Sequence, residues 1–86
     1  MTDREKAITE FAVEMTNAAV LVGSTVIYIH DDGTRTEEKT RSQAWVLPSG
    51  HGVIQLVGKS GSVSLERIRI TANNIEEARR HAVSPN

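Results

Sequence analysis

The spacing of the apolar residues changes at Gly23. Before that glycine, apolar residues recur at intervals of three and four positions, which is the period of an α-helix. After it, β-branched residues become frequent and apolar side chains alternate with polar ones, which indicates strands. A helix followed by several strands makes α+β the expected fold class.

The first 22 residues are predicted to form the helix. Thr2 and Glu5 have the spacing of a capping box, in which a hydroxyl and a carboxylate satisfy two free N–H groups at a helix start. Gly23 can end the helix, although the β-branched residues before it favour extended backbone. An apolar stripe runs along the helix and must pack on the chain's own sheet or on a neighbouring subunit. Its members are Ile8, Phe11, Ala12, Met15, Ala18, Ala19 and Val22.

Four or five short strands are predicted over residues 24–70. The first ends in Asp31-Asp32-Gly33, a strong hairpin-turn signal. The second covers residues 34–47, and its polar first half predicts an edge position. Short strands with glycine-rich turns favour a small, curled antiparallel sheet of SH3-like or open-barrel type. The remaining predicted elements are strands at 53–57, 62–65 and 68–70, and a short helix over 73–83 that is capped by Asn73 or Asn74.

The chain of 86 residues is long enough for one domain and leaves little room for a second core. We therefore expect residues 1–86 to form a single domain. The absence of cysteine excludes disulfides and thiolate metal sites, and fits a reducing cytoplasm. The apolar run at residues 18–22 is far shorter than the roughly 20 residues of a membrane span. We expect a cytoplasmic protein with no membrane contact.

The amino-acid composition indicates which kinds of partner to expect. Its only aromatic residues are Phe11, Tyr28 and Trp45, so the core must be built mainly from Val, Ile, Leu and Ala. A small core of this kind is often completed by a partner subunit, and we expect a homo-oligomer. The formal net charge is −1, although residues 34–70 hold six basic and three acidic side chains. Nucleic acid is a disfavoured partner, because domains that bind it usually have a clear excess of Lys and Arg.

The stretch from Arg35 to Trp45 is the centre of the candidate binding site. On one extended strand its alternate residues would form a basic and aromatic face. Guanidinium and ammonium groups pair with phosphate and an indole stacks on a base, so this face suits a small anionic nucleotide. The alternative is a solvated edge strand with Trp45 in the core. The candidate ligand-binding residues are Arg35, Lys39, Arg41, Gln43 and Trp45 on the strand, with Ser49, Lys59 and Ser60 in the loops.

Part of the chain resembles a known group of proteins. The pattern starts with Thr40-Arg41-Ser42-Gln43-Ala44-Trp45, continues with Leu47, Ser49-Gly50, Val53-Ile54, Gly58-Lys59-Ser60-Gly61, Val63, Leu65 and Arg67, and covers roughly residues 24–70. It is similar to a pattern found in small uncharacterised accessory proteins of bacteriophages and prophages. The resemblance implies an origin: short accessory phage genes often encode inhibitors or sequestering proteins aimed at host defence or host enzymes. It transfers no site residue to this chain.

Three features invite an enzymatic interpretation, and each has a simpler one. Gly58-Lys59-Ser60 lacks the earlier glycine of a P-loop, where Val53 stands instead, and precedes a strand, so a hairpin turn is expected. The three histidines are spread over different elements without metal-ligand spacing. Ser49 and His51 are close in sequence, and such neighbours seldom share hydrogen-bonding geometry. We expect no enzyme activity, no catalytic residue, no metal and no cofactor.

Two function classes remain. The first is a small oligomeric phage protein that sequesters a nucleotide-type signalling molecule of host defence without degrading it. The second is a protein-binding inhibitor or adaptor of a host protein, which would use the edge strand or the N-terminal helix for docking. Binding of single-stranded nucleic acid ranks third, because one exposed aromatic residue makes a poor stacking platform.

Overall fold

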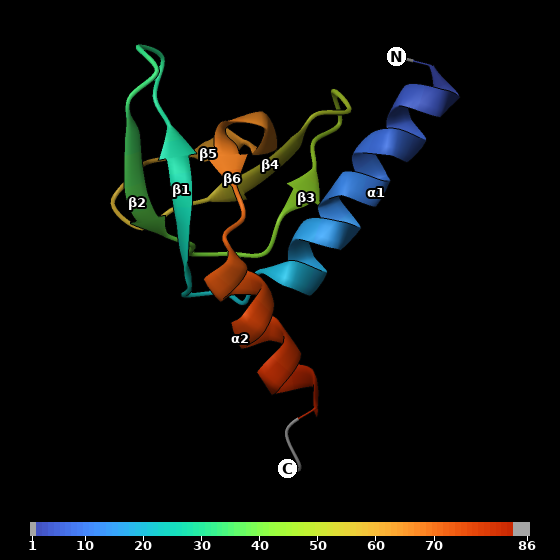
Figure 1. Cartoon of the computed structure of the whole chain (residues 1–86). Helices are drawn as coiled ribbons and strands as arrows, with labels where there is room; N and C mark the ends of the chain where they lie inside the picture. Colours follow the sequence, from blue (N-terminus) through green and yellow to red (C-terminus); the bar gives the residue numbers. More distant parts are fainter. Residues whose placement is uncertain (1, 84–86) are drawn as a thin grey trace.

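The computed structural model describes residues 2–83 and shows a helix at each end of the chain, with short strands between them (Figure 1). The α+β class predicted from the sequence is confirmed. In chain order the elements are α1 (Asp3–Ala19), β1 (Thr25–Ile29), β2 (Arg35–Lys39), β3 (Trp45–Val46), β4 (Gly52–Gln55), β5 (Ser62–Ser64), the 3-10 turn η1 (Leu65–Arg67), β6 (Ile68–Arg69) and α2 (Ala72–Val83).

The strands form two small antiparallel sheets instead of one. The first sheet has the strand order β2-β1-β6 and the second has the order β3-β4-β5. A bridge between Thr40 and Leu56 joins the chain after β2 to the chain after β4, and so links the two sheets. The sheets are not closed, and an SH3-like barrel is not confirmed. Strands of two to five residues are too short to wrap around and pair their outer edges.

Helix α1 begins as predicted and ends earlier. The Thr2 hydroxyl accepts a hydrogen bond from the Glu5 backbone N–H, and the Glu5 carboxylate accepts one from the Thr2 N–H, so the predicted capping box is confirmed. The helix ends at Ala19, because Val20 already has the extended dihedral angles φ −128° and ψ 115°. The β-branched residues before Gly23 thus leave the helix before the glycine turn.

The single long strand predicted over residues 34–47 is wrong. β2 ends before Thr40, β3 has only two residues, and the chain between them bends. Thr40 is 1% exposed, and its hydroxyl donates to the Leu21 carbonyl oxygen at 3.2 Å. Further along, the Asn17 side chain of α1 accepts from the N–H of Ala44 at 2.7 Å and donates to its carbonyl oxygen at 3.0 Å. These hydrogen bonds of Thr40 and Asn17 bend the chain after β2, where the polar sequence had predicted a straight edge strand.

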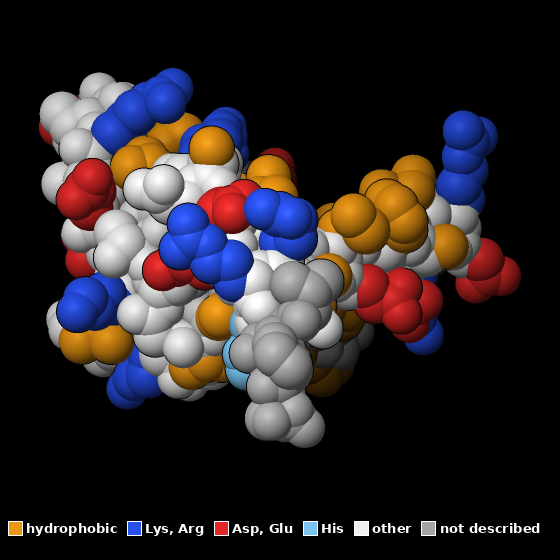
Figure 2. Space-filling model, turned by 60° about the horizontal axis from the view of Figure 1, so that its bottom comes forward, with side chains coloured by type: hydrophobic (Ala, Val, Ile, Leu, Met, Phe, Trp, Pro, Cys, Tyr) orange, Lys and Arg blue, Asp and Glu red, His pale blue; other side chains and the backbone are white. Residues whose placement is uncertain are grey.

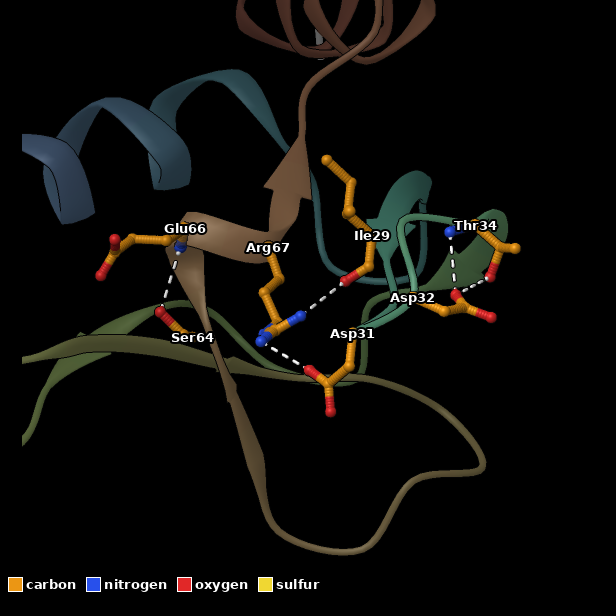
Figure 3. A network of polar contacts seen from close by, with 7 residues as sticks. All are labelled: Ile29, Asp31, Asp32, Thr34, Ser64, Glu66 and Arg67. Carbon is orange, nitrogen blue, oxygen red and sulfur yellow. Dashed lines mark hydrogen bonds and ion pairs between the residues drawn. The ribbon is translucent and has the colours of Figure 1, made fainter.

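A 3-10 turn replaces the end of the strand predicted at 62–65. β5 ends at Ser64, whose hydroxyl accepts a hydrogen bond from the Glu66 N–H and so starts η1 (Figure 3). Arg67 of η1 reaches the turn between β1 and β2, where its guanidinium pairs with the Asp31 carboxylate at 2.6 Å and donates to the Ile29 carbonyl oxygen at 3.3 Å (Figure 3). This network ties the β1–β2 hairpin to the end of β5.

The cap of α2 is Thr71, so the predicted cap at Asn73 or Asn74 is wrong. The Thr71 hydroxyl accepts a hydrogen bond from the Asn74 N–H at 3.2 Å, and the Asn74 side-chain oxygen accepts one from the Thr71 N–H at 2.9 Å. Asn74 is 1% exposed, and its amide donates to the Thr25 carbonyl oxygen at 2.7 Å. It therefore fastens α2 to β1 instead of capping the helix from outside.

The core draws on α1 and on both sheets. Partly buried Tyr28 and Leu65 pack against its rim. Its buried members are Val13, Val20, Val26, Ala44, Ile54, Leu56 and Ile68.

Candidate functional site

The candidate ligand-binding residues do not share one surface. Arg35 and Lys39 are exposed on β2, where they stand opposite Ile29 and Thr25 of β1. Residues that pair across two strands share a face, and neighbours along a strand point to opposite faces. Tyr28, which precedes Ile29, therefore faces the other side of the first sheet from these two cations.

Arg41 and Lys59, in contrast, are brought together. The Arg41 backbone N–H donates to the Gln55 carbonyl oxygen at 2.8 Å, because the chain after β2 pairs with the end of β4. This pairing carries Arg41 to the turn at residues 58–61, where one of its guanidinium nitrogens lies 3.5 Å from the Lys59 carbonyl oxygen. Ser60 is exposed in the same turn.

Lys59 also contacts an aromatic ring. Its ammonium nitrogen is 4.7 Å from the centroid of the Tyr28 ring, a cation–π contact. The His30 ring meets the Tyr28 ring edge-on, with 4.7 Å between centroids and 85° between planes. The Thr36 hydroxyl donates to the Glu38 carboxylate at 2.8 Å, so His30 Nε2, which is 2.8 Å from that hydroxyl oxygen, acts as a donor to it. We call the set Tyr28, His30, Arg41 and Lys59 the basic corner.

Tyr28 and His30 were missed as site residues, although the sequence carried a signal for them. The turn at residues 31–33 fixes the register between the first two strands, and alternation then puts Tyr28 and His30 on one side of β1. Their contact with Lys59 carried no local signal, because it depends on the distant pairing of Thr40 with Leu56.

Gln43 and Trp45 lie apart from this corner. Trp45 is 37% exposed on β3 and pairs with Val53, which is buried but outside the core cluster. Since paired residues share a face, the indole lies on the same face of the second sheet as Val53, and Trp45 is not part of the core cluster. Gln43 is exposed in the bend before it. Within residues 2–83, no hydrogen bond or cation–π contact joins either residue to the basic corner.

Ser49 and His51 do form a hydrogen bond, contrary to the expectation from their closeness in sequence. Ser49 Oγ lies 3.0 Å from His51 Nδ1. Both side chains are exposed, and the Gly50 N–H between them donates to the Leu47 carbonyl oxygen at 2.8 Å, so it is not free to stabilise an oxyanion. Within residues 2–83, no carboxylate hydrogen-bonds to His51, and no three His, Asp or Glu side chains could hold a metal ion together. The pair is a loop contact without a third orienting group.

A second notable surface runs along α1. Ile8, Phe11 and Met15 are 60%, 63% and 52% exposed, and Figure 2 shows hydrophobic side chains gathered on the arm formed by this helix. Most of the predicted apolar stripe therefore faces solvent and not the chain's own sheets. A groove of about 350 Å³ runs beside it, with walls from Glu5, Ile8, Thr9 and Ala12 of α1, the loop at 50–52 and residues 64–66.

No protein-family model, no curated protein and no solved structure matches the chain. Within residues 2–83, neither helix is both long enough and apolar enough to cross a membrane.

Proposed function

We propose that this chain is a non-enzymatic binding protein that sequesters a small anionic ligand of nucleotide type at the basic corner. The supporting observation is a chain of contacts: the Arg41 guanidinium lies 3.5 Å from the Lys59 carbonyl oxygen, the Lys59 ammonium nitrogen lies 4.7 Å from the centroid of the Tyr28 ring, and that ring meets the His30 ring. A guanidinium and an ammonium group suit a phosphate, and the partly buried rings of Tyr28 and His30 supply aromatic surface for a planar base.

Binding fits the basic corner better than catalysis does. Its charged groups are hydrogen-bond donors, and His30 uses Nε2 as a donor to Thr36, so that nitrogen is not presented as a general base. The resemblance of residues 24–70 to phage accessory proteins suggests a biological role. In that role the chain acts in the host cytoplasm and withdraws a signalling nucleotide of host defence without degrading it.

The test is a calorimetric titration of the chain with a panel of cyclic and linear nucleotides. Arg41→Ala removes a charge-assisted hydrogen-bond donor and is expected to weaken binding by about 1.5–3 kcal/mol, with an unchanged circular dichroism spectrum. Lys59→Ala acts in the same direction. Arg35→Ala is the matched control, because Arg35 is an exposed arginine on the other face of the first sheet.

Wild-type affinity in Arg41→Ala contradicts the proposal. Binding should also weaken as salt rises, since exposed charge pairs are screened. The nucleotide released on denaturation should have its original mass, and a changed mass would identify an enzyme instead.

A protein-binding inhibitor or adaptor is the second candidate, and the free edge of β2 favours it. β2 is the outer strand of the first sheet and pairs with β1, while on its other edge the Lys39 carbonyl oxygen accepts from the Val57 N–H at 2.8 Å, so the edge offered to a partner is the part before Lys39. An extended segment of a host protein can add to such an edge through backbone hydrogen bonds. Native mass spectrometry of the chain in host lysate separates the two candidates: sequestration gives a nucleotide-sized mass increase, and β-augmentation gives a protein-sized one.

A further inference from the structure

His30 is the member of the basic corner that can change its charge near neutral pH, since histidine is the side chain that ordinarily titrates there. Its Nε2–H donates to the Thr36 hydroxyl oxygen at 2.8 Å, because the hydrogen of that hydroxyl is already donated to Glu38. Within residues 2–83, Nδ1 of the same ring has no hydrogen-bond partner. A proton can therefore bind to Nδ1 without breaking any hydrogen bond of the ring.

Acidic groups on the β1–β2 hairpin favour the protonated form of His30. The Glu38 carboxylate stands at the end of the hydrogen-bond chain that starts at His30 Nε2. Asp32 is a second neighbour. Hydrogen bonds from Thr34 are the main cause that lowers the pKa of Asp32, and the charge of His30 contributes to the same lowering. The Asp32 carboxylate and a protonated His30 therefore attract one another.

Cationic groups near His30 oppose its protonation. The Tyr28 ring contacts both partners: its centroid is 4.7 Å from the Lys59 ammonium nitrogen and 4.7 Å from the centroid of the His30 ring. The Lys59 charge thus lies within about 10 Å of His30, which is one Debye length in 0.1 M salt. At the tip of the hairpin, Arg67 and Asp31 form an ion pair at 2.6 Å, so their charges largely cancel. The empty corner therefore holds positive charge that repels a proton from His30.

We infer that His30 takes up a proton when the basic corner binds its anion, so that the strength of binding depends on pH. An anion held by Arg41 and Lys59 cancels the charge that repels the proton. Proton uptake then gives the occupied corner a third cation. Since the occupied corner holds more protons than the empty one, affinity must rise as pH falls through the range in which histidine titrates. The inference rests on the proposed function, because it takes the corner to be the place where the anion binds.

Proton NMR of the histidine rings tests the coupling, with sulfate as the probe because its charge is constant across the histidine range. The chain is titrated in sodium sulfate and in sodium chloride of equal ionic strength. Sulfate is expected to move the midpoint of the His30 titration upward by about 0.5 pH unit, which corresponds to about a threefold change in affinity. His51 in the loop before β4 and His81 on α2 are the internal controls. In Arg41→Ala the shift of His30 should be lost.

A His30 midpoint that sulfate moves no further than those of His51 and His81 overturns the inference. A shift that persists in full in Arg41→Ala overturns it as well, because the anion would then act from outside the basic corner.

Calorimetric titration with cyclic nucleotides, whose phosphodiester charge does not change in this range, carries the test to the proposed ligand class. The wild-type chain is expected to bind about threefold more tightly at about pH 6 than at about pH 8. His30→Gln keeps an amide donor for Thr36 but cannot titrate, so its affinity should be equal at both pH values. His51→Gln is the matched control and should keep the pH dependence of the wild type. Circular dichroism verifies that both variants are folded.

A His30→Gln variant that retains the pH dependence of the wild type overturns the inference. Failure of the proposed function gives a different result: sulfate then moves the His30 midpoint, while no nucleotide binds at either pH. That outcome supports the proton coupling and removes the nucleotide as the ligand.

Discussion

The two faces of α1 differ in side-chain size, and the smaller side chains are the ones that hold the fold together. The reason lies in the short distance between α1 and β4. A Cβ atom on Gly52 would lie 3.0 Å from Leu65 Cδ1 and 3.3 Å from Val13 Cγ2, so no space remains at this contact for larger groups. Phe11 and Met15 lie outside this contact and are more than half exposed. Apolar size alone therefore does not identify the face that packs within a chain.

The sharpest test of this comparison places the same charge on each face. Val13→Asp puts a carboxylate into the buried contact with the sheet and should lower the free energy of unfolding by about 3 kcal/mol. Phe11→Asp on the open face should change the stability of the monomer by less than about 0.5 kcal/mol. Urea denaturation at a concentration where both variants are monomeric measures the difference. Equal losses would mean that the two faces do not differ as described.

Helix α2 is attached by a polar contact, which gives the next largest effect. Asn74→Ala leaves the Thr25 carbonyl oxygen without its donor and is expected to lower the free energy of unfolding by about 2 kcal/mol. Asn73→Ala is the control, since Asn73 is exposed one position earlier on the same helix. If both variants unfold alike in urea, the buried amide does not fasten α2.

A smaller effect is expected where α1 approaches β4. Gly52→Ala adds one methyl group against Leu65 and Val13 and should lower the free energy of unfolding by about 1 kcal/mol. The double variant Gly52→Ala with Val13→Ala should lose less than the sum of the two single variants, because the second change makes room for the first. A strictly additive double-mutant cycle would show that the two residues do not compete for space.

The smallest effect concerns pH at the start of α1. The Thr2 backbone N–H, and after it the Thr2 hydroxyl, donate to the Glu5 carboxylate and hold its pKa below the ordinary value of 4.5. A carboxyl group whose pKa is lowered by folding stabilises the fold above its unfolded pKa, and this contribution is lost as pH falls through its folded pKa. Helicity measured by circular dichroism should therefore decrease on acidification below that value. The decrease should be shallower in Thr2→Ala and unchanged in Thr2→Ser.

The parts of the fold that the sequence predicted correctly are encoded by neighbouring residues. The Thr2–Glu5 capping box and the hairpin turn at residues 31–33 each need only a few adjacent side chains. The bend after β2 depends on Thr40 bonding to Leu21 and on Asn17 bonding to Ala44, which are contacts between distant segments. Polarity alone could not distinguish these buried polar groups from the solvated ones on an edge strand.

The candidate site was predicted only in part, because some of its residues meet through contacts between distant segments. Arg41 and Lys59 were both identified as ligand-binding candidates, and they do lie together. Arg35 and Lys39 were grouped with them on the assumption of one straight strand, but they face the other side of the first sheet. Tyr28 was absent from the prediction, because its neighbour Lys59 belongs to a turn about thirty residues away.

The position of Trp45 makes the molecule convenient for optical spectroscopy. It is the chain's single tryptophan, half-exposed on the outer side of the second sheet, and Tyr28 in the basic corner is the single tyrosine. Tryptophan emission is therefore expected to change when the second sheet unfolds and to stay constant when a ligand occupies the basic corner. One unlabelled sample can thus distinguish loss of structure from occupation of the site.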